Sequence, residues 1–116
     1  MIIALEDAKY KLLALRDDIK ELGSALRIDE LRNNVAELEK QTLDADFWNN
    51  QENSSRVLQT IKQTKDKIEG YDALHNRLED AIALAEMAIE ENDESSVPEV
   101  QAELEAINRE KEERRI

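Results

Sequence analysis

The chain has 116 residues, of which 38% are charged and 3% aromatic, and its formal net charge is -12. This length fits a single domain, and two glycines and one proline are too few for the many tight turns of a β-sandwich. The apolar content of 41% is regularly spaced, which argues against disorder. The composition therefore predicts a helical bundle or a coiled coil.

The acidic balance opposes a direct nucleic-acid grip, because phosphate binding needs a concentrated basic face. An acidic helical surface suits a basic partner, although solubility alone is the more common explanation. The chain has no cysteine, which excludes disulfides and thiolate metal sites and agrees with a reducing compartment. No apolar run approaches the roughly 20 residues of a membrane span, and Glu6 and Asp7 interrupt any signal-peptide core. We expect a soluble, cytoplasmic chain without membrane contact.

The first predicted helix covers residues 4–22. Its apolar side chains alternate at intervals of three and four, which is typical of a seam packed against another helix: Leu5, Ala8, Leu12, Leu15, Ile19, Leu22 and Leu26. Gly23 and Ser24 are expected to weaken this helix. Asp29 is expected to cap a second helix over residues 30–43, whose apolar stripe consists of Leu31, Val35 and Leu38.

The third predicted helix covers residues 51–91, after Asn49 or its rival Asn50 as the cap. Its apolar positions continue without a slip through Gly70, with Thr64 and His75 filling polar places in the seam. Gly70 should cost about 1 kcal/mol relative to alanine. We therefore expect one continuous rod of about 60 Å, either straight or bent at Gly70.

A turn at residues 92–95 precedes the last predicted helix, over residues 97–115. Ser96 is expected to cap it, Pro98 is tolerated in a first turn, and Glu99 would complete a capping box. Because each helix exposes an apolar stripe that needs burial, we expect an all-α, elongated antiparallel bundle of about four helices with coiled-coil-like packing. The second helix would cover one end. The stripes can also pair between molecules, so a dimer of the chain remains an alternative.

The only Phe and the only Trp, Phe47 and Trp48, are adjacent in the polar linker between the second and third helices. Large aromatic rings usually owe their place to burial. Packing of both rings under the chain reversal is therefore the favoured interpretation, and an exposed partner contact is the alternative.

The remaining candidate sites have simpler explanations. Asp72 and His75 have the carboxylate-x-x-His spacing of half a di-iron site, but His75 is the only histidine, so we expect it at the edge of the seam beside Leu74 and Leu78. The acidic run at residues 90–94 lacks the glycine and ligand spacing of a calcium loop. No phosphate loop or nucleophile elbow is present. We predict no enzymatic activity for this chain and no catalytic, cofactor-binding or metal residue.

Several segments resemble the class I peptide chain release factors, in particular the N-terminal domain of the release factor 2 type. The similar segments cover almost the whole chain: the leucine seam of the first helix, Leu26-Arg27-Ile28-Asp29, Asp44-Ala45-Asp46-Phe47-Trp48-Asn49-Asn50, Tyr71-Asp72-Ala73-Leu74, Leu78-Glu79-Asp80, Glu90-Glu91-Asn92-Asp93 and Glu113-Arg114-Arg115. The Asp-x-x-Phe-Trp element favours release factor 2 over release factor 1. Ala45 and Gln51 depart from the family, which commonly has proline at these places.

The resemblance implies a longer protein that recognises UGA and UAA stop codons and triggers peptidyl-tRNA hydrolysis on the ribosome. The Gly-Gly-Gln loop and the codon-recognition tripeptide of that family belong to later domains, and this chain has no Gly-Gly pair. It therefore looks like a single, non-catalytic first domain, residues 1–116. The family places this domain beside the stalk base of the large ribosomal subunit, with the recycling release-factor GTPase as a further partner. The alternative is an unrelated helical coiled-coil scaffold or adaptor.

Overall fold

The structure, a computed structural model, describes residues 1–116 and contains only helices. They are α1 (Ile3–Ala25), α2 (Ile28–Gln41), the short 3-10 helix η1 (Ala45–Asn49), α3 (Gln51–Glu90), the 3-10 turn η2 (Glu94–Ser96) and α4 (Val97–Arg114). The molecule measures 65 × 23 × 17 Å. The predicted all-α class, elongated shape and single long helix are confirmed.

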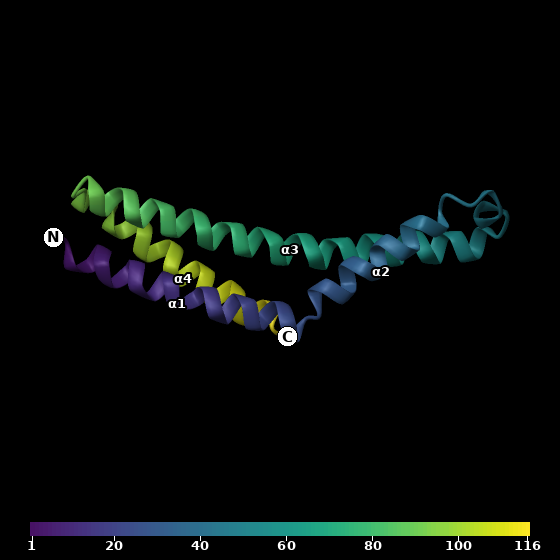
Figure 1. The fold of residues 1–116 in the computed structure, drawn as a ribbon, viewed down its shortest axis with the longest axis horizontal. Helices are drawn as coiled ribbons and strands as arrows, with labels where there is room; N and C mark the ends of the chain where they lie inside the picture. The colour runs from purple at the N-terminus through teal and green to yellow at the C-terminus, as the bar shows by residue number, and fades with distance from the viewer.

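Helix α3 runs the whole length of the molecule, and the other helices divide it between them (Figure 1). Helices α1 and α4 lie against its C-terminal half, both antiparallel to it. Helix α2 lies beyond α1 and packs along the N-terminal half of α3, so it does not cover the end of the bundle as predicted. We call the three-helix part the bundle half, and α2, η1 and the N-terminal half of α3 the arm.

The bundle half holds the main core, in which the predicted seam of α1 faces α3 and α4. Every predicted seam position from Leu5 to Leu22 is buried, and Leu26 is partly buried. The core comprises fourteen buried residues: Leu5, Ala8, Leu12, Leu15, Ile19, Leu22, Leu74, Leu78, Ala81, Ile82, Ala85, Ala88, Val100 and Ile107. This apolar burial is the dominant favourable term for folding.

The arm has a much smaller core, consisting of Val35 from α2 and Ile61 and Ile68 from α3. Leu31, Leu38 and Val57 pack around it and remain partly exposed. With two helices, each side chain at the interface keeps one flank open to water. The arm is therefore held together by less apolar burial than the bundle half.

The junction between α1 and α2 differs from its prediction. Helix α1 continues through Gly23 and Ser24, and the break falls at Arg27, which has the left-handed conformation with φ 55°. Asp29 lies inside the first turn of α2 and makes no side-chain cap. The acid still suits this position, because the positive end of the helix dipole favours a negative charge.

Helix α3 is a single α-helix of 40 residues that passes through Gly70 without a break, as predicted. Its cap is Asn50, whose side-chain oxygen accepts a hydrogen bond from the Asn53 amide at 3.1 Å, while Asn49 belongs to η1. At the other end, Asn92 has φ 53°. The Asp93 amide there donates to the Ala88 carbonyl at 2.9 Å, the 6→1 bond of a Schellman ending.

The start of α4 differs in detail from the predicted capping box. Pro98 lies in the first turn as expected, but the Ser96 side chain caps no helical amide. Its hydroxyl donates instead to Asp93 at 2.9 Å, and Asp93 also accepts from the Ser95 amide at 3.0 Å. The predicted side-chain cap of α4 by Ser96 is therefore absent, and Asp93 caps the preceding turn η2 instead.

Candidate functional site

The linker aromatics, the strongest sequence signal, lie at the free end of the arm and have different environments. Phe47 is buried, with 8% of its surface exposed, whereas Trp48 is 54% exposed. Their rings meet edge to face with centroids 4.9 Å apart, a favourable aromatic geometry. The prediction that both rings are buried is correct for Phe47 and wrong for Trp48.

Trp48 is nevertheless fixed in position. Its indole N–H donates to the Thr42 carbonyl at 3.1 Å, and the Thr42 hydroxyl donates to the Glu39 carbonyl at 2.6 Å, at the end of α2. Asp44 holds the start of η1 by accepting from the Asp46 amide at 3.0 Å. The exposed ring is thus attached to the last turn of α2 on one side and to buried Phe47 on the other.

Asp72 of the Asp72/His75 pair is engaged by an arginine from α2. Both Asp72 oxygens accept hydrogen bonds from Arg32, at 2.6 and 2.9 Å, and these bonds hold the pKa of the Asp72 carboxyl below its ordinary value. His75 is exposed beside the fully buried Leu74. The apolar pattern had placed His75 in the seam. In the structure the seam passes through Leu74 instead. No group of three or more metal-ligating side chains is assembled anywhere in the chain.

The acidic run that ends α3 is likewise engaged in local structure. Asp93 accepts from the hydroxyls and an amide of Ser95 and Ser96. These hydrogen bonds hold the pKa of the Asp93 carboxyl below its ordinary value. Its oxygens organise the turn between α3 and α4.

Ion pairs cross the α1–α3 interface at heptad spacing. Lys9 meets Glu86 at 4.0 Å, and Arg16 meets Glu79 at 2.7 Å. The two pairs are seven residues apart on each helix, which is the repeat of coiled-coil packing. The Arg16 hydrogen bonds also hold the pKa of the Glu79 carboxyl below its ordinary value.

The same spacing recurs between α2 and α3 in the arm. Arg32 meets Asp72 at 2.6 Å, and Lys65 meets Glu39 at 2.9 Å. These pairs too are seven residues apart on each helix. Sequence reasoning missed both sets, although charges repeated at sevens on the flanks of an apolar seam are the signal that could have revealed them.

The two glycines mark the places where a neighbouring side chain lies directly on a helix backbone. A Cβ on Gly23 would lie 2.5 Å from the Tyr71 hydroxyl, and that hydroxyl donates to the Ile19 carbonyl at 3.1 Å. A Cβ on Gly70 would collide with the Arg114 guanidinium. Gly23 therefore allows α3 to approach α1 closely, and Gly70 leaves room for the end of α4.

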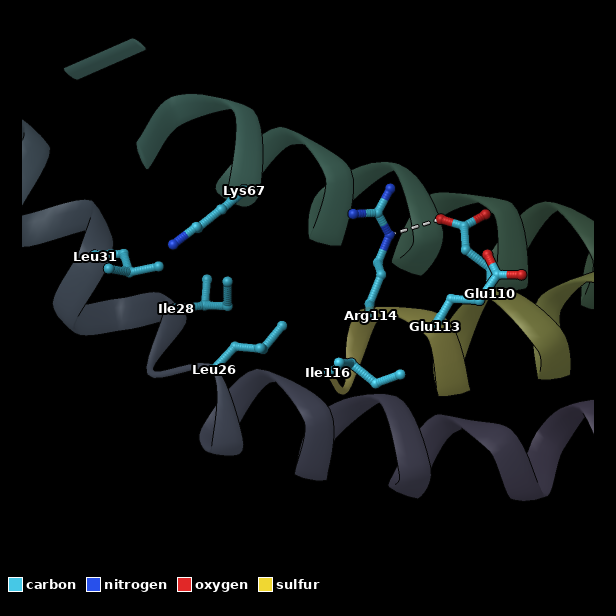
Figure 2. A pocket seen from close by; sticks show the side chains of 8 residues that line it. All are labelled: Leu26, Ile28, Leu31, Lys67, Glu110, Glu113, Arg114 and Ile116. Carbon is cyan, nitrogen blue, oxygen red and sulfur yellow. Dashed lines mark hydrogen bonds and ion pairs between the residues drawn. The ribbon is translucent and has the colours of Figure 1, made fainter. Parts of the chain in front are cut away.

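A groove lies where the bundle half meets the arm (Figure 2). One side is apolar, with Leu26, Ile28 and Leu31 from the α1–α2 junction, and Lys67 reaches from α3 toward the start of α2. Arg114 and Glu110 of α4, joined at 2.8 Å, lie on the opposite side. Its volume of about 550 Å³ is in the range of ligand pockets. It is open to solvent and lined by both apolar and charged side chains.

No helix combines the length and apolar character that crossing a bilayer requires.

The profile of the PCRF domain matches residues 31–115. The chain belongs to the PCRF domain family. This match covers most of α2 and the whole of η1, α3 and α4, and it leaves out α1.

Curated relatives of this PCRF domain are peptide chain release factors 2 from several bacteria. The protein from Clostridium perfringens (strain SM101 / Type A) is 36% identical over 110 residues, which is 95% of this chain and 30% of the relative. The Streptomyces avermitilis protein is 27% identical over 107 residues, or 92% and 29% of the two chains. The Petrotoga mobilis protein is 26% identical over 103 residues, or 89% and 28%. No solved structure matches.

This PCRF domain chain spans about 30% of the length of the curated relatives it matches. The predicted relationship to release factor 2 is confirmed over nearly the whole sequence. This similarity contradicts the alternative of a helical scaffold unrelated to release factors.

Proposed function

We propose that this PCRF domain is a non-catalytic positioning module of a peptide chain release factor. Its place would be in a cytoplasmic protein that terminates translation at UGA and UAA codons, bound beside the stalk base of the large ribosomal subunit, with the recycling release-factor GTPase as a second partner. The similarity to release factor 2 over 95% of the chain carries this proposal.

The physical features of the chain support a positioning role. A rod 65 Å long, with one helix common to both halves, is suited to holding two points at a fixed separation. The titratable groups pair with one another across helix interfaces and do not converge in a closed cleft. The domain would contribute binding energy and orientation, and the chemistry would belong to other parts of the factor.

Ribosome pelleting tests this proposal with the 116-residue chain itself. We expect the labelled chain to sediment with isolated large subunits but not with small subunits, and excess unlabelled chain should displace it. A designed helical hairpin of equal length and charge controls for non-specific adsorption. Equal recovery of both proteins, or no recovery with large subunits, would contradict the positioning role.

A second test concerns a release factor that carries this domain. Removal of residues 1–116 should weaken ribosome binding or slow stop-codon-dependent peptide release, with the Gly-Gly-Gln loop intact. Unchanged binding and release in the shortened factor would argue against the proposal.

A further inference from the structure

The free end of the arm carries an apolar surface that the fold does not need. Leu43 is 84% exposed and Trp48 is 54% exposed, and Trp48 is bonded to Thr42, the residue next to Leu43. Isolated exposed apolar residues are normal on protein surfaces. Both residues lie in the linker between α2 and α3, at one extremity of the molecule, and we call this exposed pair the arm tip.

The arm tip is ordered before any partner arrives. The bond to Thr42, the edge-to-face contact with Phe47 and the Asp44 cap of η1 hold Trp48 facing outward. A side chain that is already immobilised loses less entropy on binding. Tryptophan is also enriched among the residues that dominate protein interfaces.

The charges around the arm tip indicate the chemistry of its partner. Residues 42–55 contain three acids, Asp44, Asp46 and Glu52, and no Lys or Arg. A phosphate backbone is repelled by such a rim. A protein surface with an apolar depression ringed by Lys and Arg complements both the apolar side chains and the acids.

We propose that the arm tip, centred on Trp48 and Leu43 with Asp46 at its rim, is a docking surface for a basic protein face and not for nucleic acid. Trp48 would enter the apolar depression, and the acids would meet the basic rim. This inference rests on the proposed function, which places the domain on the large ribosomal subunit. The partner would be a protein component of that subunit.

The test compares variants of the 116-residue chain in binding to purified large subunits. Trp48→Ala should weaken binding at least about tenfold, as for a central interface tryptophan. Leu43→Ser should weaken it severalfold, and because Leu43 is so exposed this change leaves the fold intact. Tyr10→Ala removes another exposed ring, 76% exposed on α1 in the bundle half, and should leave binding unchanged. Circular dichroism verifies that each variant is folded.

The charge reversal Asp46→Lys separates the two classes of partner. A basic protein face predicts weaker binding, whereas contact with RNA predicts tighter binding. A photoreactive residue at position 43 should form crosslinks to protein. Crosslinks to RNA only, or tighter binding of Asp46→Lys, would overturn the inference.

The controls distinguish failure of this inference from failure of the proposed function. If the unmodified chain and all variants bind equally, the arm tip is not the contact and the positioning role stands. If the unmodified chain does not bind large subunits, both proposals fail together.

Discussion

The bundle half and the arm use the same helix, α3, in different ways. In the arm, α3 buries one residue per heptad, namely Ser54, Ile61 and Ile68. In the bundle half it buries six residues between Leu74 and Ala88. The difference shows that the number of neighbouring helices determines how much of the surface of α3 is buried.

The residue types follow the same division. Where α1 and α4 both pack on α3, the buried positions include Ala81, Ala85 and Ala88, small side chains that allow three backbones to approach. Where only α2 packs, the buried apolar positions of α3 are the larger Ile61 and Ile68. We infer that the arm opens at a lower free energy than the bundle half.

Truncation of the core should give the largest difference between the halves. Leu78→Ala removes a fully buried side chain of the bundle half and should lower the free energy of unfolding by about 3 kcal/mol. Ile61→Ala in the arm should cost less, about 2 kcal/mol, because Ile61 is already 8% exposed and the site can relax. Urea denaturation followed by circular dichroism measures both.

Hydrogen exchange of the same two variants sharpens the comparison. Ile61→Ala should accelerate exchange of amides in α2 and the N-terminal half of α3, with little change in α1 and α4. Leu78→Ala should accelerate exchange throughout. Uniform acceleration in both variants would mean that the molecule opens as one unit, contrary to the division described above.

The two glycines should respond to alanine with opposite signs. Gly23→Ala places a methyl group against the Tyr71 ring, which is held by its bond to Ile19, so we expect a loss of about 1 kcal/mol despite the better helix propensity. Gly70→Ala meets only the far end of the long, flexible Arg114 side chain, which can shift, so we expect a gain of about 0.5 kcal/mol. Thermal unfolding of both single variants tests this.

Tyr71→Phe supplies the matched background for Gly23. It removes the hydroxyl nearest the added methyl group, so Gly23→Ala should cost less in this background than in the unmodified chain. Equal costs in the two backgrounds would show that the Tyr71 hydroxyl does not set the requirement for glycine.

Loss of an ion pair should have the smallest effect and a defined pH dependence. Arg77 donates to Glu103 at 2.8 and 2.9 Å, and these bonds hold the pKa of the Glu103 carboxyl below its ordinary value of 4.5. Both groups are substantially exposed, so Arg77→Met should cost about 0.5 kcal/mol at neutral pH.

The sign of that pH dependence follows from the lowered pKa. The folded state binds this proton less readily than the unfolded state, so the pair stabilises the fold above the unfolded pKa and the contribution declines as pH falls through the folded value. The stability difference between Arg77→Met and the unmodified chain should therefore shrink below about pH 4.5. A difference that grows toward acid pH would contradict this assignment.

Apolar periodicity was sufficient to predict the helices and the bundle core. The three-and-four spacing from Leu5 to Leu22 requires only that one face of α1 be buried, and that face is buried. The unbroken register through Gly70 correctly predicted one long helix. These features depend on local sequence and on a general need for burial.

The features that were missed depend on contacts between distant residues. Phe47 and Trp48 are adjacent large aromatics, and sequence alone does not show that the short η1 turns one inward and the other outward. Gly23 is a plausible helix breaker until Tyr71, far along the chain, is placed on it. Ser96 does not cap α4 as predicted, because its hydroxyl donates to Asp93, whose carboxylate accepts several hydrogen bonds at once and caps η2.

The continuity of α3 has a mechanical consequence. Besides α3, the halves are joined covalently only through Leu26 and Arg27, so any bend of α3 near Gly70 would move the arm relative to the bundle half. The part of α3 in the arm is about 20 residues, or about 30 Å, and a tilt of about 10° at Gly70 would carry Trp48 through about 5 Å. A small change in the packing of Arg114 against Gly70 would thus produce a larger displacement at the far end of the arm.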